Sequence, residues 1–192
     1  MMPIAWIKTI EPEDASGALA AAYAEAKTPA GTVDNVMKAH SLRPGTLAGH
    51  LALYRAVLHG NDIVLPLWFL ETVASYVSLI NDCDYALRHH FRNARALLAD
   101  DGRADAVLAA LRAGRPERAF DGKELALLRY AAKLTARVGD MAPADVADLR
   151  AAGADDGEIL EVNQVSAYFN YSNRLLNGLG VSTQGDRIGY YD

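Results

Sequence analysis

Apolar residues recur at helical spacing along nearly the whole chain, whereas the alternation typical of strands is almost absent. Ala, Leu and Arg dominate, and all three favour helices. Proline and glycine mark the ends of the periodic segments, as at Pro44 and Gly60. The pattern predicts helices over 14–28, 33–42, 44–60, 65–80, 83 up to Gly102, 103–113, 122–138, 143–152 and 156–178.

The predicted helix 65–80 is apolar nearly all round, which is typical of a buried central helix. It nevertheless carries Glu71, Ser75 and Ser78 on one face. A buried carboxylate is costly unless it is paired. Either the polar stripe faces a functional site, or Glu71 caps a neighbouring helix or pairs with an arginine.

These elements predict one all-α domain over residues 1–192, because no shift in composition marks a boundary. The last residues, VSTQGDRIGYYD, are rich in aromatic side chains. We expect this tail to pack on a neighbouring subunit.

Composition narrows the class of protein. The formal net charge is −5, which argues against a general nucleic-acid surface. One cysteine excludes an internal disulfide. The first residues lack the features of a signal peptide, and no apolar run reaches the roughly 18 residues of a membrane span. These observations predict a cytoplasmic protein without membrane or nucleic-acid partners.

The stretch NDCDYALRHH holds that cysteine and two histidines. Cys83 falls in the first turn of a predicted helix, where the helix dipole favours a thiolate; the alternative is a small buried hydrophobic residue. His89 and His90 point about 100° apart, so we do not expect them to face one site together. Cys83 lies about 10.5 Å of helix rise from His90, too far for a direct hydrogen bond. His90 is instead placed for a group at position 86, which is Ala86.

The order Glu71, Cys83, Ala86, His90 resembles the Glu…Cys-x-x-Cys-x-x-x-His signature of the AhpD-like alkylhydroperoxidases, in the carboxymuconolactone decarboxylase superfamily. The segments AWIKTIEPEDASGALAAAYAEAK, NVMKAHSLRPGTLAGHLALYRAVLHG and AYFNYSNRLLNGLGV look like the "peroxidase-related enzyme" branch of that family. The resemblance therefore covers most of the chain.

The resemblance implies an all-helical AhpD-like fold with a central pair of motif helices, assembled as a homodimer, trimer or hexamer. It implies hydroperoxide reduction through cysteine thiols with an external thiol or dithiol reductant, and it implies neither a cofactor nor a metal ion. The catalytic residues carried over are Glu71, Cys83 and His90.

Ala86 departs from the signature, because the second cysteine stands there in the family. The two-cysteine cycle is impossible without it. The leading hypothesis is that Cys83 alone reduces a hydroperoxide. One alternative is a non-redox lyase or decarboxylase that uses Glu71 and His90 on a small organic acid or lactone. Another is a non-catalytic helical oligomer that binds a small ligand.

Other polar residues have less specific explanations. His40 and His50 are expected to be structural rather than to line a pocket with Tyr54. We expect no metal site at Glu71, His89 and His90, because adjacent histidines rarely share an ion. A polar and aromatic cluster in the last helix is expected to pack between subunits rather than to edge the pocket. Its members are Phe169, Asn170, Tyr171, Asn173 and Arg174.

Overall fold

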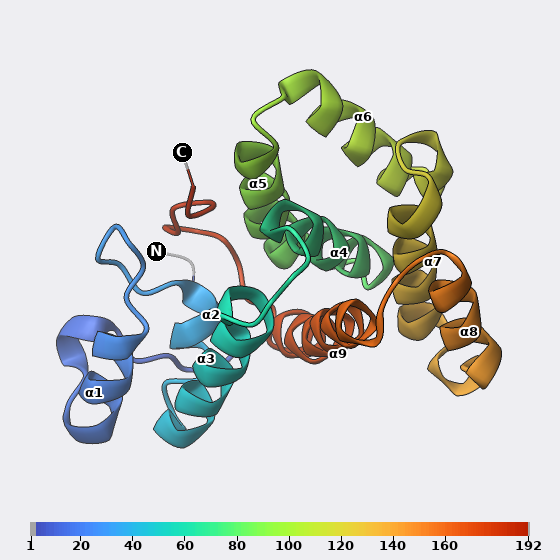
Figure 1. The fold of residues 1–192 in the computed structure, drawn as a ribbon. Helices are drawn as coiled ribbons and strands as arrows, with labels where there is room; N and C mark the ends of the chain where they lie inside the picture. The colour runs from blue at the N-terminus through green and yellow to red at the C-terminus, as the bar shows by residue number, and fades with distance from the viewer. Residues whose placement is uncertain (1–2, 192) are drawn as a thin grey trace.

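A computed structural model describes residues 3–191, and these residues form α-helices joined by loops and short 3₁₀ turns, with no strand (Figure 1). The expected all-α class is confirmed. The helices are α1 (Gly17–Glu25), α2 (Asn35–Lys38), α3 (Pro44–His59), α4 (Leu67–Ile80), α5 (Asp84–Leu98), α6 (Asp101–Arg112), α7 (Gly122–Ala136), α8 (Pro143–Ala151) and α9 (Asp156–Leu179). The 3₁₀ turns span Pro12–Asp14, Pro116–Arg118 and Val138–Asp140. Each helix in residues 3–191 is too short or too polar to cross a bilayer.

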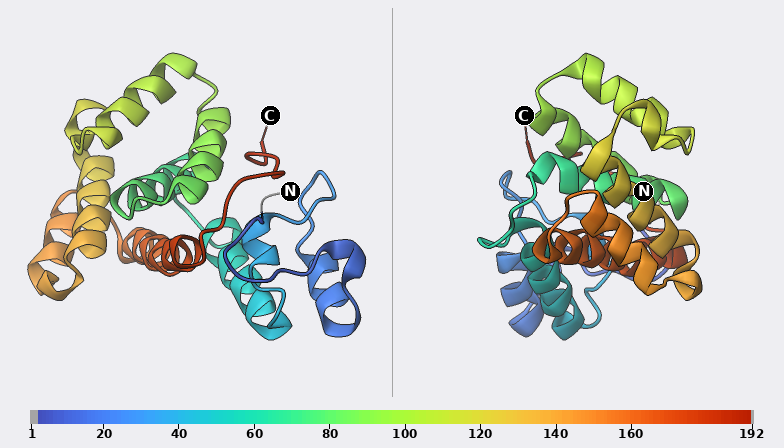
Figure 2. Two further views of the ribbon diagram at one scale, coloured as in Figure 1. Left: turned by 180° about the vertical axis from the view of Figure 1, so that it is seen from behind. Right: turned by 45° about the vertical axis from the view of Figure 1, so that its right-hand side comes forward.

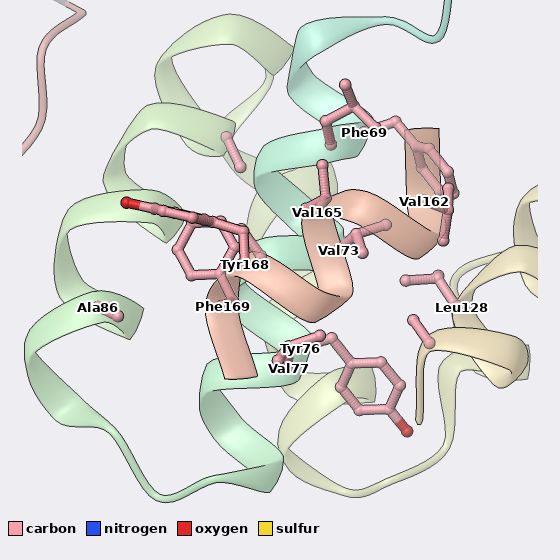
Figure 3. Close-up of a cluster of buried hydrophobic side chains, with 14 of the residues drawn as sticks. Phe69, Val73, Tyr76, Val77, Ala86, Leu128, Val162, Val165, Tyr168 and Phe169 are labelled. Atoms are coloured by element: carbon pink, nitrogen blue, oxygen red, sulfur yellow. The ribbon is translucent and has the colours of Figure 1, made fainter. Parts of the chain in front are cut away.

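The helices α4, α5 and α9 lie at the centre, with α1–α3 on one side and α6–α8 on the other (Figures 1 and 2). In the core, Phe69 and Val73 of α4 meet Val162 and Val165 of α9, and Leu128 of α7 closes the cluster (Figure 3). A smaller apolar cluster joins α1, α2 and α3. Packing of these apolar faces, rather than helix propensity, stabilises the arrangement.

The central position predicted for 65–80 is confirmed, because residues 69–78 are all buried. Of the predicted stripe of Glu71, Ser75 and Ser78, the two serines are satisfied by their own helix. The hydroxyl of Ser75 donates to the carbonyl of Glu71 at 2.7 Å, and that of Ser78 donates to the carbonyl of Ala74 at 2.8 Å. The carboxylate of Glu71 instead points away from its own backbone to partners on α5.

The predicted helix from 83 to Gly102 is wrong at its end. The helix α5 stops at Leu98, because Ala99 adopts a left-handed conformation with φ 51°. The side chain of Asp100 then accepts a hydrogen bond from the backbone N–H of Arg103 at 2.9 Å. This N-cap begins α6 at Asp101 and competes with continuation of α5.

The long helix α9 begins and ends as predicted. Asp155 accepts from the backbone N–H of Glu158, and Glu158 accepts in turn from that of Asp155. Gly180 ends the helix with φ 59°. A Cβ atom there would lie 2.1 Å from Cε2 of Trp6, so the close approach of Trp6 also requires glycine.

The C-terminal segment, residues 181–190, runs back between α2 and α5 (Figure 1). The backbone N–H of Ser182 donates to the carbonyl of Ile4 at 2.9 Å. The side chain of Asn35 donates to the carbonyls of Ser182 and Gln184, each at 2.9 Å. These contacts bind the tail to its own chain, and its packing on a neighbouring subunit stays a prediction.

Candidate functional site

The carboxylate of Glu71 lies between α4 and α5 and is fully buried. Its Oε2 is 2.6 Å from Nδ1 of His90. Glu71 is thus buried and bonded to the helix that carries His90. Within residues 3–191, the carboxylate bonds to neither an arginine nor a helix end. The alternative that Glu71 caps a helix or pairs with an arginine is therefore wrong.

Asn93 is a member of the site that the sequence reasoning missed. It is fully buried one turn beyond His90, and its Nδ2 donates to Oε1 of Glu71 at 3.0 Å. Its Oδ1 accepts from the backbone N–H of Tyr190 at 2.7 Å. The signal was present in the sequence as a polar residue three positions after His90, on the face that meets α4.

The ring of His90 is held on two sides. Glu71 binds Nδ1, and the ring of Phe169 meets the imidazole edge to face at a centroid distance of 4.5 Å. An ionised carboxylate can only accept hydrogen bonds, so beside ionised Glu71 the neutral imidazole carries its proton on Nδ1. Nε2 is then the nitrogen with a lone pair, available to accept a proton.

His90 lines an inner cavity of about 30 Å³, enough for one or two water-sized groups. Ala86, His89 and His90 contribute the wall from α5. The rest of the wall is Asp34, Val36, Met37, His50, Tyr54, Tyr85, Tyr168, Ser172, Leu176 and Tyr190. None of these described lining residues is a lysine or an arginine.

Three buried polar atoms on this wall have no hydrogen-bond partner within the described chain. They are Oδ1 of Asp34, Nδ1 of His50 and Nε2 of His89. Each of these residues is at most 5% exposed. Nε2 of His89 nevertheless lies 3.7 Å from Oδ2 of Asp186. Buried polar atoms are usually satisfied by protein or water, so the atoms of Asp34 and His50 are the ones suited to hydrogen bonds with a small polar molecule in the cavity.

Burial also sets the charge of this wall. Desolvation raises the pKa of Asp34, and the nearby Asp186 raises it further, although the hydrogen bond from Tyr190 opposes both. Desolvation, reinforced by His40, lowers the pKa of His50 to about 3. His50 is therefore neutral at pH 7, where its Nε2 shares a 3.0 Å hydrogen bond with the hydroxyl of Tyr168.

The sequence expectations for the histidines need two corrections. His50 lines the cavity, because α3 packs against α9 and presents this side chain to Tyr168. His89 and His90 also line one cavity despite their different directions. His90 turns to Glu71, whereas His89 stacks on Tyr85 at 4.8 Å between ring centroids, and the cavity lies between them.

Cys83 is the N-cap residue of α5 and is 1% exposed. Burial raises the pKa of its thiol; the backbone N–H of Ala86 lowers it, while Asp84 and Asp82 raise it further. The net direction is opposite to the one expected from the helix dipole. Ala86, and not Cys83, contributes to the cavity wall.

An outer chamber of about 360 Å³ adjoins the inner cavity. The two share Asp34, Met37, Tyr54 and Tyr190 as lining residues, so these side chains form the boundary between them. Lys27 and Arg55 line only the outer chamber. The two cavities are therefore neighbours, separated by the side chains that they share.

A larger hollow of about 610 Å³ lies beside α7 and α8, away from Glu71. Its Lys133 and Asp145 bind each other at 2.6 Å. This hollow contains none of the predicted site residues, so we place the candidate site at the smaller cavity. Across residues 3–191, no three His, Cys, Asp or Glu side chains are grouped as ligands of a metal ion.

The polar and aromatic cluster in α9 packs within the chain. Phe169 contacts His90, Asn173 binds Ser78, and Asn170 binds Asn81. Tyr171 is 45% exposed. Phe169 and Asn173 are thus buried within the chain, whereas packing between subunits stays a prediction for the exposed Tyr171 and Arg174.

Neither a protein-family model nor a curated protein sequence matches the chain. Solved structures do match. A peroxidase-related protein with an alkylhydroperoxidase AhpD core, from Ralstonia eutropha JMP134, is 22% identical with a TM-score of 0.83, covering 97% of this chain and 95% of that one. A peroxidase-related protein from Silicibacter sp. TM1040 is 28% identical with a TM-score of 0.71, covering 81% and 79%.

The debrominase Bmp8 has the same fold at 13% identity, with a TM-score of 0.75 and coverage of 93% and 91%; that structure is a cysteine-to-alanine variant in complex with 2,3,4-tribromopyrrole. The chain therefore has the AhpD-like fold and matches peroxidase-related proteins over most of its length. The resemblance expected from the sequence is confirmed at this level.

Proposed function

We propose that the chain is an enzyme of the peroxidase-related AhpD-like group that transfers protons to and from a small uncharged organic molecule, which binds in the outer chamber with its reacting group in the inner cavity. His90 is the acid–base group, and Glu71 is its buried partner. The observation that carries this proposal is the 2.6 Å contact between Nδ1 of His90 and Oε2 of Glu71 beside a cavity wall formed by Ala86. General acid–base groups of this kind contribute about 10²–10⁴-fold to a rate.

The charge of the site supports an uncharged substrate. The inner cavity presents Asp34, with Glu71 and Asp186 bonded behind its wall, and no basic residue other than histidine. A carboxylate of an organic acid would be repelled there. A neutral lactone or similar carbonyl compound fits better, with its body in the outer chamber and its carbonyl group directed past Tyr54 and Tyr190 into the inner cavity.

A second candidate is hydroperoxide reduction by Cys83, and similarity to peroxidase-related proteins favours it. The thiolate of Cys83 would attack the outer oxygen of the hydroperoxide, breaking the O–O bond and giving a sulfenic acid and an alcohol. One external thiol would form a mixed disulfide with release of water, and a second would regenerate Cys83 as a disulfide product leaves. The buried thiol with its raised pKa counts against this route. The debrominase with the same fold is consistent with chemistry other than peroxide reduction.

Two experiments separate these routes. Intact-mass analysis after one equivalent of cumene hydroperoxide, with and without a trapping thiol, detects an oxygen atom added to Cys83. NMR in D₂O with a panel of small uncharged lactones and β-diketones detects ring opening or deuterium exchange. We expect turnover in the second assay that His90→Gln abolishes and Cys83→Ser retains. Rapid oxidation of Cys83 that requires Glu71, without turnover of the panel, would replace the first route by the second.

We also propose that the protein is a cytoplasmic homo-oligomer. Trp6, Val64 and Val138 are 77%, 71% and 68% exposed, and contacts between copies of the chain would remove these apolar side chains from water. Sedimentation at micromolar concentration should show a stable assembly. A monomer in that range would contradict the proposal.

A further inference from the structure

We infer that Asn93 is a positioning residue that holds Glu71 in register with His90, and that the backbone N–H of Tyr190 fixes the orientation of Asn93. The C-terminal segment is then part of the site rather than a passive tail. This inference rests on the proposed function in so far as Glu71 and His90 are its proton-transfer pair.

The orientation of the Asn93 amide is determined by its two neighbours. On one side stands the backbone N–H of Tyr190, which can only donate. On the other stands Oε1 of Glu71, which accepts when the carboxylate is ionised. Rotating the amide by 180° would set donor against donor and acceptor against acceptor. The N–H of Tyr190 therefore directs the NH₂ group of Asn93 to Glu71.

This bond in turn fixes the carboxylate. Asn93 engages Oε1, so Oε2 is the oxygen that faces Nδ1 of His90. Glu71 and Asn93 are both fully buried, so solvent does not replace the bond if Asn93 is removed. Loss of the amide would leave one carboxylate oxygen unsatisfied and free to rotate towards other partners, which weakens the selection of the Nδ1-protonated form of His90.

The C-terminal segment is anchored on both sides of this contact. The hydroxyl of Tyr190 donates to Oδ2 of Asp34. Oδ2 of Asp186 accepts from the hydroxyl of Tyr85 at 2.5 Å, and its Oδ1 accepts from the backbone N–H of Asn35 at 3.1 Å. These bonds hold the Tyr190 N–H against α5 with little freedom to move.

Gly189 makes the approach of the segment to α5 possible. Its φ is 81°, and a Cβ atom would lie 2.5 Å from Cγ of Arg92 and 3.1 Å from Oδ1 of Asn93. Gly185 also has a positive φ, 86°, but a Cβ atom there would meet nothing within 4 Å. Alanine at either position strains the backbone, whereas only alanine at 189 pushes the segment away from Asn93.

The test reads the tautomer of His90 directly, in the full-length protein. The ¹⁵N signals of its imidazole are recorded over a series of pH values and assigned by their loss in His90→Gln. For the neutral ring we expect a protonated Nδ1 and an unprotonated Nε2 in the native chain. Asn93→Leu and Tyr190→Pro should both shift these signals towards a mixture of tautomers, whereas Tyr190→Phe, which keeps the N–H, should not. Unchanged signals in folded Asn93→Leu would overturn the inference.

A second pair of variants keeps the test decisive if Asn93→Leu or Tyr190→Pro does not fold. We expect Gly189→Ala to shift the His90 signals and Gly185→Ala to leave them in place; equal effects would overturn the inference. Turnover should fall at least tenfold in Asn93→Leu. Because the NMR measurement needs no substrate, its result stands even if the proposed reaction fails. Turnover that depends on Glu71 but not on Asn93 would contradict the role inferred for Asn93 and leave the proposed function in place.

Discussion

Glu71 and His90 belong to different helices, yet Oε2 of the first lies 2.6 Å from Nδ1 of the second. The contact exists because α4 and α5 pack side by side along most of their length. Glu71 is fully buried, whereas the side chain of His90 is 13% exposed. The pair thus joins the protein interior to the cavity, which is the arrangement a proton-transfer group needs.

Replacing Glu71 by glutamine should reduce turnover about 100-fold or more, since acid–base groups contribute on that scale. The amide can still accept from Asn93, but its NH₂ group cannot accept the proton of His90 Nδ1. The imidazole must then switch its tautomer or lose the bond. Turnover of the lactone panel measures the effect. Glu13→Gln, at an exposed carboxylate far along the chain, is the matched control, and equal turnover of both variants would contradict the prediction.

The thiol of Cys83 should react slowly at pH 7. Burial raises its pKa, so the thiolate is a smaller fraction at each pH than in an unfolded chain. The rate of alkylation by iodoacetamide should increase with pH and reach half its maximum above the ordinary cysteine pKa of about 8.5. The same chain in denaturant is the control. A half-maximal rate below that pH in the folded protein would restore Cys83 as an activated nucleophile.

The helices were predictable because apolar periodicity is a local property, as α4 and α9 show. Glu71 was predictable because a carboxylate in an apolar helix needs a partner, whereas His90 was identified through the resemblance to the AhpD-like signature. Asp34 and Tyr190 were not, because they meet across 156 positions of sequence through a tail without periodicity. Asn93 was missed for a related reason, since its role depends on a backbone N–H of that same tail.

His50 should make the protein less stable in mild acid. Its pKa is about 3 in the folded chain and about 6.5 when unfolded. Between these values the unfolded state binds the extra proton, so stability is complete above pH 6.5 and decreases as the pH falls towards 3. At pH 4.5 the loss is about 2–3 kcal/mol, by the value of one pKa unit.

Urea unfolding at pH 7 and pH 4.5 measures this loss for the native chain and for His50→Leu. The pKa of Asp34 is raised, which gives a contribution of opposite sign, and His40 adds one of the same sign. Both groups remain in the variant, so the difference between the two proteins isolates His50. An equal loss of stability in both would show that His50 is already charged in the folded state.

Replacing Ala86 by cysteine should restore a dithiol. Ala86 lines the cavity and lies one turn before His90, so a thiol there would face the base that Glu71 orients. We expect it to form an intramolecular disulfide with Cys83 and to support peroxide turnover with a dithiol reductant, measured by intact mass and by peroxide consumption. The adjoining cavity should hold the cost in folding stability below the roughly 1–3 kcal/mol of an overpacked core.

Ala94→Cys, fully buried on the same helix but away from the cavity, is the control. A folded Ala86→Cys protein that forms no disulfide and shows no peroxide turnover would contradict this prediction. It would mean that the cavity is built for a reaction other than peroxide reduction.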